Sequence, residues 1–161
     1  MNDKTIIGRV EQVSFPIIGI KDIPAKIDTG ADLSSIWATN IRETKNGLSF
    51  VLFGDNSTFY TGKIFRLSPG EYTITRISNS FGHKEYRYRV KLTLKIAKKK
   101  INATFTLSDR KDKLYPVLIG RRTINNKFYV DVASGSPLRD QELERSKRLS
   151  QELQKLKVTE K

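Results

Sequence analysis

The chain has 161 residues, 37% of them hydrophobic, with no cysteine and one histidine, His83. This length suits a single domain with a sizeable core, while the absence of cysteine excludes disulfide bonds and every Cys-based metal site. Thirty Lys and Arg against seventeen Asp and Glu give a net charge of +13, which favours anionic partners such as RNA, ribosomes or acidic peptides.

The N-terminus and the apolar runs predict a soluble, cytoplasmic protein. Residues 1–5 lack the apolar stretch and the small-residue cleavage site of a signal peptide. No apolar run approaches the roughly 18 residues of a membrane span. A Gly-rich phosphate loop is also absent. We therefore expect no membrane association, no metal and no cofactor.

The first part of the chain is rich in β-branched residues and is interrupted by Pro and Gly. Residues 5–20 predict two short strands, which lead into a third strand that ends at Asp28. The following stretch, Lys26-Ile27-Asp28-Thr29-Gly30-Ala31-Asp32, presents a carboxylate, a hydroxyl and a glycine in consecutive positions. This is how a tight turn at a strand end presents a carboxylate, but an ordinary surface turn uses the same residues. Other features of the chain are needed to distinguish a functional turn from an ordinary surface turn.

Turn signals and alternation predict further strands. Asn46-Gly47 predicts a hairpin before a strand at 48–53, and strands at 58–67 and 71–78 are separated by Ser68-Pro69-Gly70. From 85 to 96, polar residues alternate with apolar ones, as in a strand of an antiparallel sheet with one solvent-exposed face. The basic residues of that polar face are Arg87, Arg89, Lys91 and Lys95.

The last strands are predicted at 101–107, 115–122 and 128–132. The run at 115–122 is continuously apolar up to Gly120, which is typical of a strand buried on both faces. About ten short strands favour an all-β fold, a closed or nearly closed β-barrel, over residues 1–136. Residues 137–161 become rich in Leu, Glu, Lys and Arg, and predict a C-terminal helical or disordered tail.

Two motifs resemble the retropepsin-like aspartic peptidases. They are Ile27-Asp28-Thr29-Gly30-Ala31-Asp32 and Leu118-Ile119-Gly120-Arg121, the second of which packs beside the catalytic turn in that family. The resemblance implies an acid-protease barrel with a short helix after Gly120. It implies catalytic roles for Asp28, Thr29 and Gly30, substrate binding by Ala31, Asp32 and Gly82, and structural support from Leu118, Ile119, Gly120 and Arg121.

A closer resemblance, over most of residues 6–132, is to the bacterial and archaeal family labelled ATP-dependent zinc protease. It rests on the segment around Asp28, on Ile77-Ser78-Asn79, and on Thr106-Leu107-Ser108-Asp109-Arg110 followed by the run that ends at Arg121. Members are associated with the ATP-grasp ligases that add glutamates to ribosomal protein S6, which implies a glutamate ligase or a ribosomal protein as partner. The residues offer neither zinc ligands nor a nucleotide loop, so they do not support the label.

This chain departs from that family at two positions. Members commonly have a basic residue in place of Asp32 and a histidine near the position of Trp37. Asp32 instead matches the viral retropepsin pattern, in which the carboxylate pairs with the arginine matching Arg121. We therefore predict an ion pair between Asp32 and Arg121.

Aspartic peptidases hydrolyse amides with two carboxylates and one water. A single Asp-Thr-Gly predicts a homodimer in which the second carboxylate is Asp28 of another subunit. Asp131 is a rival for that role, although the chain is too short for two lobes and its position suits a strand end.

The expected flap is the hairpin at 74–88, with Gly82 at its tip, and an ordinary surface hairpin is the alternative. The basic face favours an acidic peptide or protein substrate, and the family's link with glutamylation suggests a glutamate-rich one. We expect an aspartic endopeptidase. The alternative is a non-catalytic binding module that regulates a glutamate ligase or a ribosomal protein.

Overall fold

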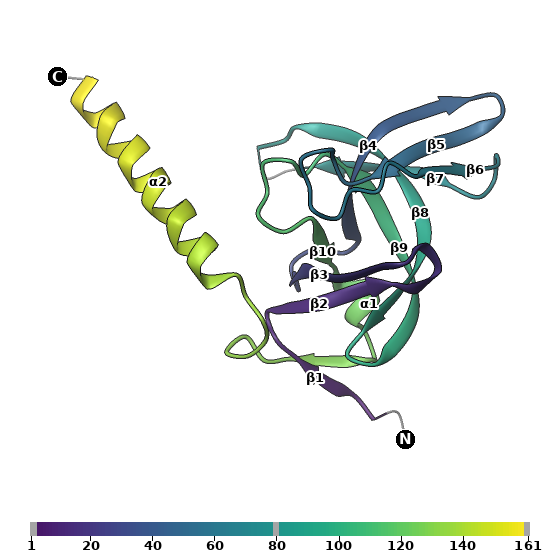
Figure 1. The fold of residues 1–161 in the computed structure, drawn as a ribbon, viewed down its shortest axis with the longest axis horizontal. Coiled ribbons are helices and arrows are strands. Elements are labelled where there is room, and N and C mark those ends of the chain that lie inside the picture. The colour runs from purple at the N-terminus through teal and green to yellow at the C-terminus, as the bar shows by residue number, and fades with distance from the viewer. Residues whose placement is uncertain (1–2, 79–80, 160–161) are drawn as a thin grey trace.

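The computed structural model describes residues 3–78 and 81–159, and it consists mainly of β-strands (Figure 1). The strands are β1 (Thr5–Ile7), β2 (Val10–Phe15), β3 (Ile20–Ile27), β4 (Ser34–Thr44), β5 (Gly47–Leu52), β6 (Ile64–Leu67), β7 (Thr73–Ser78), β8 (Lys84–Ile96), β9 (Lys99–Ser108), β10 (Val117–Ile119) and β11 (Phe128–Val130). The helices are a short 3-10 turn η1 (Pro16–Ile18), α1 (Arg121–Ile124) and α2 (Arg139–Thr159).

Six of the strands close into a ring in the order β10-β3-β2-β8-β9-β4. β10 closes it, because this strand pairs in parallel with β3 and antiparallel with β4. β5 and β6 extend the ring beyond β4, and β7 pairs with β8. The predicted all-β fold is confirmed, and the short helix expected after Gly120 is α1.

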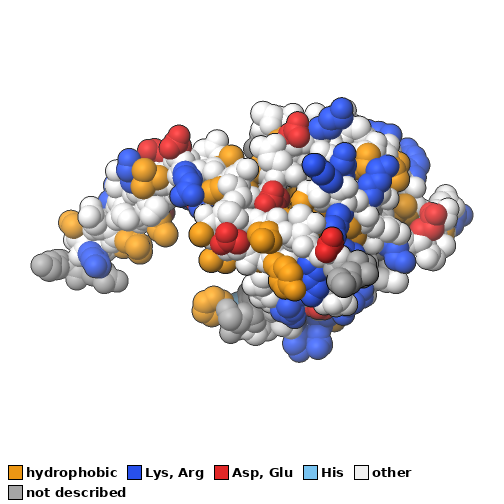
Figure 2. All heavy atoms as spheres, turned by 90° about the horizontal axis from the view of Figure 1, so that it is seen from below, with side chains coloured by type: hydrophobic (Ala, Val, Ile, Leu, Met, Phe, Trp, Pro, Cys, Tyr) orange, Lys and Arg blue, Asp and Glu red, His pale blue; other side chains and the backbone are white. Residues whose placement is uncertain are grey.

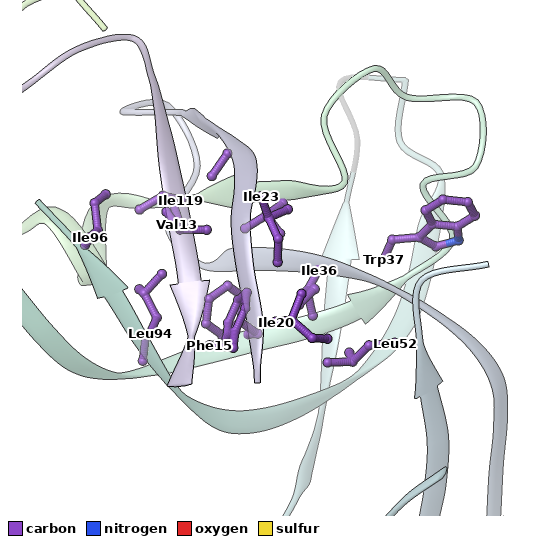
Figure 3. Packing of buried hydrophobic residues seen from close by; sticks show 14 of the residues in the cluster. Val13, Phe15, Ile20, Ile23, Ile36, Trp37, Leu52, Leu94, Ile96 and Ile119 are labelled. Atoms are coloured by element: carbon purple, nitrogen blue, oxygen red, sulfur yellow. The ribbon is translucent and has the colours of Figure 1, made fainter. Parts of the chain in front are cut away.

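The core fills the inside of this ring (Figure 3). The rings of Phe15 and Phe105 meet edge to face with their centroids 5.7 Å apart, and both side chains are fully buried. Leu94 and Ile96 are also buried, as the alternation in β8 predicts. Such a core excludes water from the strands that carry the motifs, and dispersion contacts make it stiff.

The strand predicted at 58–67 is wrong in its first half, because β6 begins only at Ile64. Residues 54–63 form turns in which side chains bond the neighbouring backbone. Ser57 Oγ accepts from Phe59 N at 3.2 Å, and Thr61 Oγ1 accepts from Lys63 N at 3.3 Å. Hydroxyl side chains that bond locally in this way compete with the pairing of a strand.

Helix α2 projects away from the strands and is attached through its first two turns (Figure 1). Both terminal nitrogens of Arg9 donate to the Glu142 carboxylate, at 2.9 and 2.8 Å. The Tyr115 hydroxyl donates to Glu142 Oε1 at 2.6 Å and accepts from Leu138 N at 3.0 Å. The predicted tail is therefore a helix, and this cluster of Arg9, Tyr115 and Glu142, here called the helix clamp, fixes its base.

The rest of α2 is exposed. Leu149 and Leu153, which the sequence places on one helical face, are 57% and 52% exposed. Among residues 3–78 and 81–159, neither the long helix nor the short ones have the length and apolar character needed to cross a membrane.

Candidate active site

Asp28 lies in a tight turn directly after β3. Its backbone N–H donates to Ile119 O of the neighbouring β10 at 2.9 Å. Within the turn, Gly30 N donates to Asp28 Oδ1 at 3.0 Å, and Ala31 N donates to Asp28 O at 3.3 Å. These bonds fix the carboxylate relative to the ring, and the residue remains half-buried, within reach of solvent.

The segment after β10 lies against this turn. Arg121 N donates to Ala31 O at 2.7 Å, and the Arg121 guanidinium donates to Gly30 O, also at 2.7 Å. Gly120 allows the approach, because a Cβ at this position would lie 2.5 Å from the carbonyl carbon and oxygen of Leu33. The structure thus places Leu118, Ile119, Gly120 and Arg121 beside the Asp28 turn.

Asp32 is paired with two arginines of α1. The predicted pair with Arg121 is present, with 3.9 Å between Arg121 Nη2 and Asp32 Oδ1. A closer pair, which the sequence did not predict, joins Arg122 Nη2 and Asp32 Oδ2 at 2.9 Å. All three side chains are at least half exposed, so the pairs orient the turn more than they stabilise the fold.

Buried hydroxyl groups support the turn from the inside. Ser34 Oγ accepts from Gly120 N at 3.0 Å and shares a 2.8 Å hydrogen bond with Thr123 Oγ1. Next to it, Ser35 Oγ and Ser108 Oγ lie 2.7 Å apart. We did not predict these contacts, although two adjacent serines in the apolar run 33–38 were a signal for them.

Arg87 and Arg89 belong to the β8 face that the sequence predicts to be exposed to solvent. That expectation is wrong in part, because Arg87 and Arg89 are only partly exposed. Their Nε atoms are buried, and neither has an acceptor among the described residues. Burial and, secondly, the charge of Arg87 lower the pKa of Arg110, whereas Asp28 raises it. Arg110 is therefore close enough to interact electrostatically with Arg87 and with Asp28, which the sequence did not predict.

The hairpin expected to serve as a flap is formed by β7 and β8, which pair from Thr73↔Arg89 to Ser78↔Lys84. Gly82 at its tip is exposed and has a φ of +78°, a conformation that favours glycine. Asn79 and Ser80, also part of the expected tip, lie outside the described residues.

Asp131 has the hydrogen bonds of a strand-end residue. Its N–H donates to Ile7 O at 2.9 Å, and its Oδ1 accepts from Ala133 N at 3.0 Å. This is a local turn that ends β11, so the structure gives no support to Asp131 as a second catalytic carboxylate.

The metal-binding potential of the site follows from its donor groups. Within residues 3–78 and 81–159, no three His, Asp or Glu side chains gather closely enough to hold a metal ion. The donor set therefore does not fit the zinc that the resembling family's label implies.

Comparisons with known proteins agree with this geometry. Residues 6–141 match the RimB-like family model, described as retropepsin-like aspartic endopeptidase RimB. The fold is also that of a Legionella pneumophila crystal structure described as protein Lpg0085 with unknown function. The TM-score is 0.62 and the identity 28%, over 83% of this chain and 97% of that one.

Longer relatives bear a different name. A "Probable alpha-L-glutamate ligase" of Shewanella pealeana is 33% identical over 132 residues, and one of Desulfotalea psychrophila is 31% identical over 140 residues. Each alignment covers 81% of this chain but only 29% and 28% of the relative. The chain thus spans less than a third of the curated relatives it matches.

Proposed function

The chain belongs to the RimB-like family of retropepsin-like aspartic endopeptidases, and from this premise we propose that it hydrolyses peptide bonds with a water activated by two Asp28 carboxylates. One carboxylate comes from each subunit of a homodimer. The observation that carries the proposal is the Asp28 turn, which β10 holds by the bond from Asp28 N to Ile119 O.

The chemistry follows from placing two such turns face to face. Two carboxylates at contact distance cannot both ionise, so they share one proton. The ionised member takes a proton from water as the water oxygen attacks the carbonyl carbon of the scissile amide, and the protonated member donates to the carbonyl oxygen. When the C–N bond then breaks, the proton taken from water passes to the leaving amine. Gly30 has no side chain to obstruct a substrate backbone, and Thr29 is exposed beside it. The two apparent pKa values of such a pair describe both carboxylates together and cannot be divided between them.

A surface suited to dimerisation lies near the turn. β1 and β11 form a parallel sheet of only two strands, an arrangement that is marginal in water without further contacts. Exposed hydrophobic side chains on and beside it are Ile6, Tyr129 and Val132, which are 67%, 60% and 74% exposed. Figure 2 views the molecule from the side on which β1 lies in Figure 1, and it shows hydrophobic groups among many Lys and Arg. We propose this sheet as part of the dimer interface.

Arg110 and two arginines of β8 support an acidic substrate. Arg110 interacts electrostatically with Asp28 and with Arg87, and the Nε donors of Arg87 and Arg89 are buried without an acceptor among the described residues. Carboxylates of a bound peptide would satisfy such donors with charge-assisted hydrogen bonds. The glutamate ligases among the relatives make a glutamate-rich chain the substrate we favour, and such a ligase or a ribosomal protein the partner.

The test is digestion of a peptide library that includes acidic peptides, by wild type and Asp28→Asn, read by mass spectrometry across acidic to neutral pH. We expect the substitution to lower cleavage about 10²–10⁴-fold, because it removes the proton-transferring group. Asp131→Asn is the matched control and should retain activity. Equal cleavage by wild type and Asp28→Asn, or a strictly monomeric active protein, would contradict the proposal.

A second candidate is a non-catalytic binding module. The observation in its favour is that this region forms less than a third of relatives named as ligases. Such a module would bind a glutamate ligase or ribosomal protein equally well as wild type and as the Asp28→Asn variant, and it would cleave nothing. The same pair of proteins therefore separates the two functions.

A further inference from the structure

A groove on the flank of the ring is distinct from the Asp28 turn. It lies where β2 and β3, the loops at 54–59 and 111–116, and the start of α2 meet, and it encloses about 500 Å³. None of residues 28–32 lines it. The lining residues used below are Trp37, Phe59, Lys111, Lys113, Gln12 and Gln141.

Trp37 forms part of the groove and is 7% exposed. Its ring is packed so closely on Gly54 that a Cβ there would lie 2.5 Å from Trp37 Cζ2. The backbone N–H of Trp37 donates to Pro116 O at 2.9 Å, which fixes the residue against the loop before β10. Figure 3 shows the indole at one edge of the labelled core side chains.

The indole Nε1–H of Trp37 is a buried donor without an acceptor among the described residues. A buried donor in this state is energetically unfavourable, because it has lost its hydrogen bonds to water. Trp37 lines the groove, and a ligand whose carbonyl or carboxylate oxygen reached the indole N–H from there would satisfy this donor. The groove therefore favours a ligand rich in acceptor oxygens.

The charges of the groove specify the ligand further. Lys111 and Lys113 are exposed at its margin, Gln12 and Gln141 add amide groups, and Asp22 is the acidic residue of the lining. Phe59 contributes apolar surface beside the indole. An extended peptide with acidic side chains fits this combination, since its backbone carbonyls suit the indole N–H and its carboxylates suit the lysines.

One segment joins the groove to the candidate active site. The loop at 111–116 lines the groove and leads directly into β10, whose Ile119 O accepts from Asp28 N at 2.9 Å. We propose that the groove is a second binding site of the enzyme, which holds the acidic chain of the substrate beyond the segment cleaved at Asp28. This inference rests on the proposed function for its role, but binding in the groove is measurable without cleavage.

Trp37 is the single tryptophan of the chain, so its fluorescence reports directly on the groove. The experiment titrates the Asp28→Asn variant of the 161-residue chain, in which cleavage should be lost, with an oligoglutamate peptide and an oligoglutamine peptide of the same length. We expect a saturable change in emission with oligoglutamate that weakens with added salt, and no change with oligoglutamine.

Charge reversal tests the lysines. Lys111→Glu with Lys113→Glu should weaken oligoglutamate binding by about tenfold or more, which corresponds to about 1.4 kcal/mol. Lys45→Glu with Lys100→Glu is the matched control, because both lysines are exposed and neither lines the groove. This control should bind within about twofold of the parent. If the groove reversal fails to fold by circular dichroism, Lys111→Gln with Lys113→Gln replaces it, with the same direction of effect expected.

The outcomes separate the groove from the proposed function. An emission that does not respond to oligoglutamate, or equal losses in the groove and control variants, overturns the groove site, even if wild type cleaves acidic peptides. A saturable, lysine-dependent response with no cleavage by wild type supports the groove and overturns the endopeptidase activity instead.

Discussion

The Asp28 turn and helix α2 are attached to the same ring of strands by different means. The turn is held by backbone hydrogen bonds to β10 and its following segment, by a buried serine, and by a glycine that fits against backbone. The helix is held by the helix clamp and by a bond from Arg145 to Asp112 O, and its leucines beyond that point face solvent. The first attachment consists mainly of backbone and hydroxyl groups, supplemented by the Arg121 guanidinium and the exposed pairs of Asp32, whereas the second depends on the Glu142 carboxylate.

This difference has a physical consequence. Buried uncharged hydrogen bonds keep their strength over the whole pH range, and losing one partner leaves a costly unsatisfied group. A partly exposed ion pair contributes little to global stability and changes with pH. The geometry of the candidate active site is therefore expected to change little with pH. The attachment of α2 should weaken when the pH falls far enough to protonate Glu142.

The largest expected effect is at Gly120. Gly120→Ala puts a methyl group 2.5 Å from the backbone of Leu33, so the turn and the start of α1 must move apart. We expect a loss of about 3 kcal/mol or more in the free energy of unfolding, measured by urea denaturation.

Gly19→Ala is the matched control for Gly120→Ala. Gly19 has a φ of +71° but no atom within 4 Å of an added Cβ, so only backbone strain opposes the change, worth about 1 kcal/mol. Equal losses for the two variants would show that the turn is not tightly packed against β10.

Ser34→Ala should have an intermediate effect. It leaves Gly120 N without its acceptor and removes the bond to Thr123 Oγ1 in a buried place. We expect a loss of about 2 kcal/mol in the same measurement. Ser49→Ala, which removes only a 3.4 Å bond to Arg42 O, should stay within about 0.5 kcal/mol. A neutral Ser34→Ala would mean that the buried hydroxyls do not support the turn.

The smallest effect on stability is expected at the helix clamp. Arg9 and then Tyr115 lower the pKa of Glu142 from 4.5 to about 2. The pKa of Glu142 is lower in the folded state than in the unfolded state. Its contribution to the free energy of unfolding is therefore fully present above about pH 4.5 and is lost as the pH falls through about 2. Glu142→Gln should lower the free energy of unfolding by less than about 1 kcal/mol at neutral pH, because the pair between Arg9 and Glu142 is partly exposed.

The pH dependence is best followed at Leu138, whose N–H donates to the Tyr115 hydroxyl. Its amide chemical shift should change with a midpoint near pH 2 in the wild type and remain flat over the same range in Glu142→Gln. A wild-type midpoint near 4.5 would show that the clamp is open in solution.

The sequence predicts the strands of the ring better than it predicts the site. Alternation in β8 and the turn at Asn46-Gly47 correspond to observed elements, because both signals are local. The position of the Leu118-Ile119-Gly120 run beside the turn came from the family resemblance, since strand periodicity does not reveal which strands pair. The prediction of a strand at 58–63 is wrong because Ser57 and Thr61 bond the nearby backbone, which competes with strand pairing.

The parts of the site that were missed depend on contacts between distant segments. Ser34 meets Thr123 across 89 positions of the chain, which no local pattern encodes. Alternation places Arg87 and Arg89 on one face of β8, but it does not say whether other parts of the chain cover that face. For the same reason the pair between Asp32 and Arg122 was missed, while the pair with Arg121 followed from the family pattern.

β10 lies late in the chain, so the ribosome synthesises it well after the Asp28 turn that it supports. Arg121, which bonds the Asp28 turn, follows Gly30 by 91 residues. At about 5–20 residues per second, the Asp-Thr-Gly sequence leaves the peptidyl-transferase centre roughly 5–20 s before its supporting segment is made. The ring cannot close and the turn cannot take its final shape during that interval. A nascent chain therefore carries the Asp-Thr-Gly sequence before the turn that presents Asp28 can take its final shape.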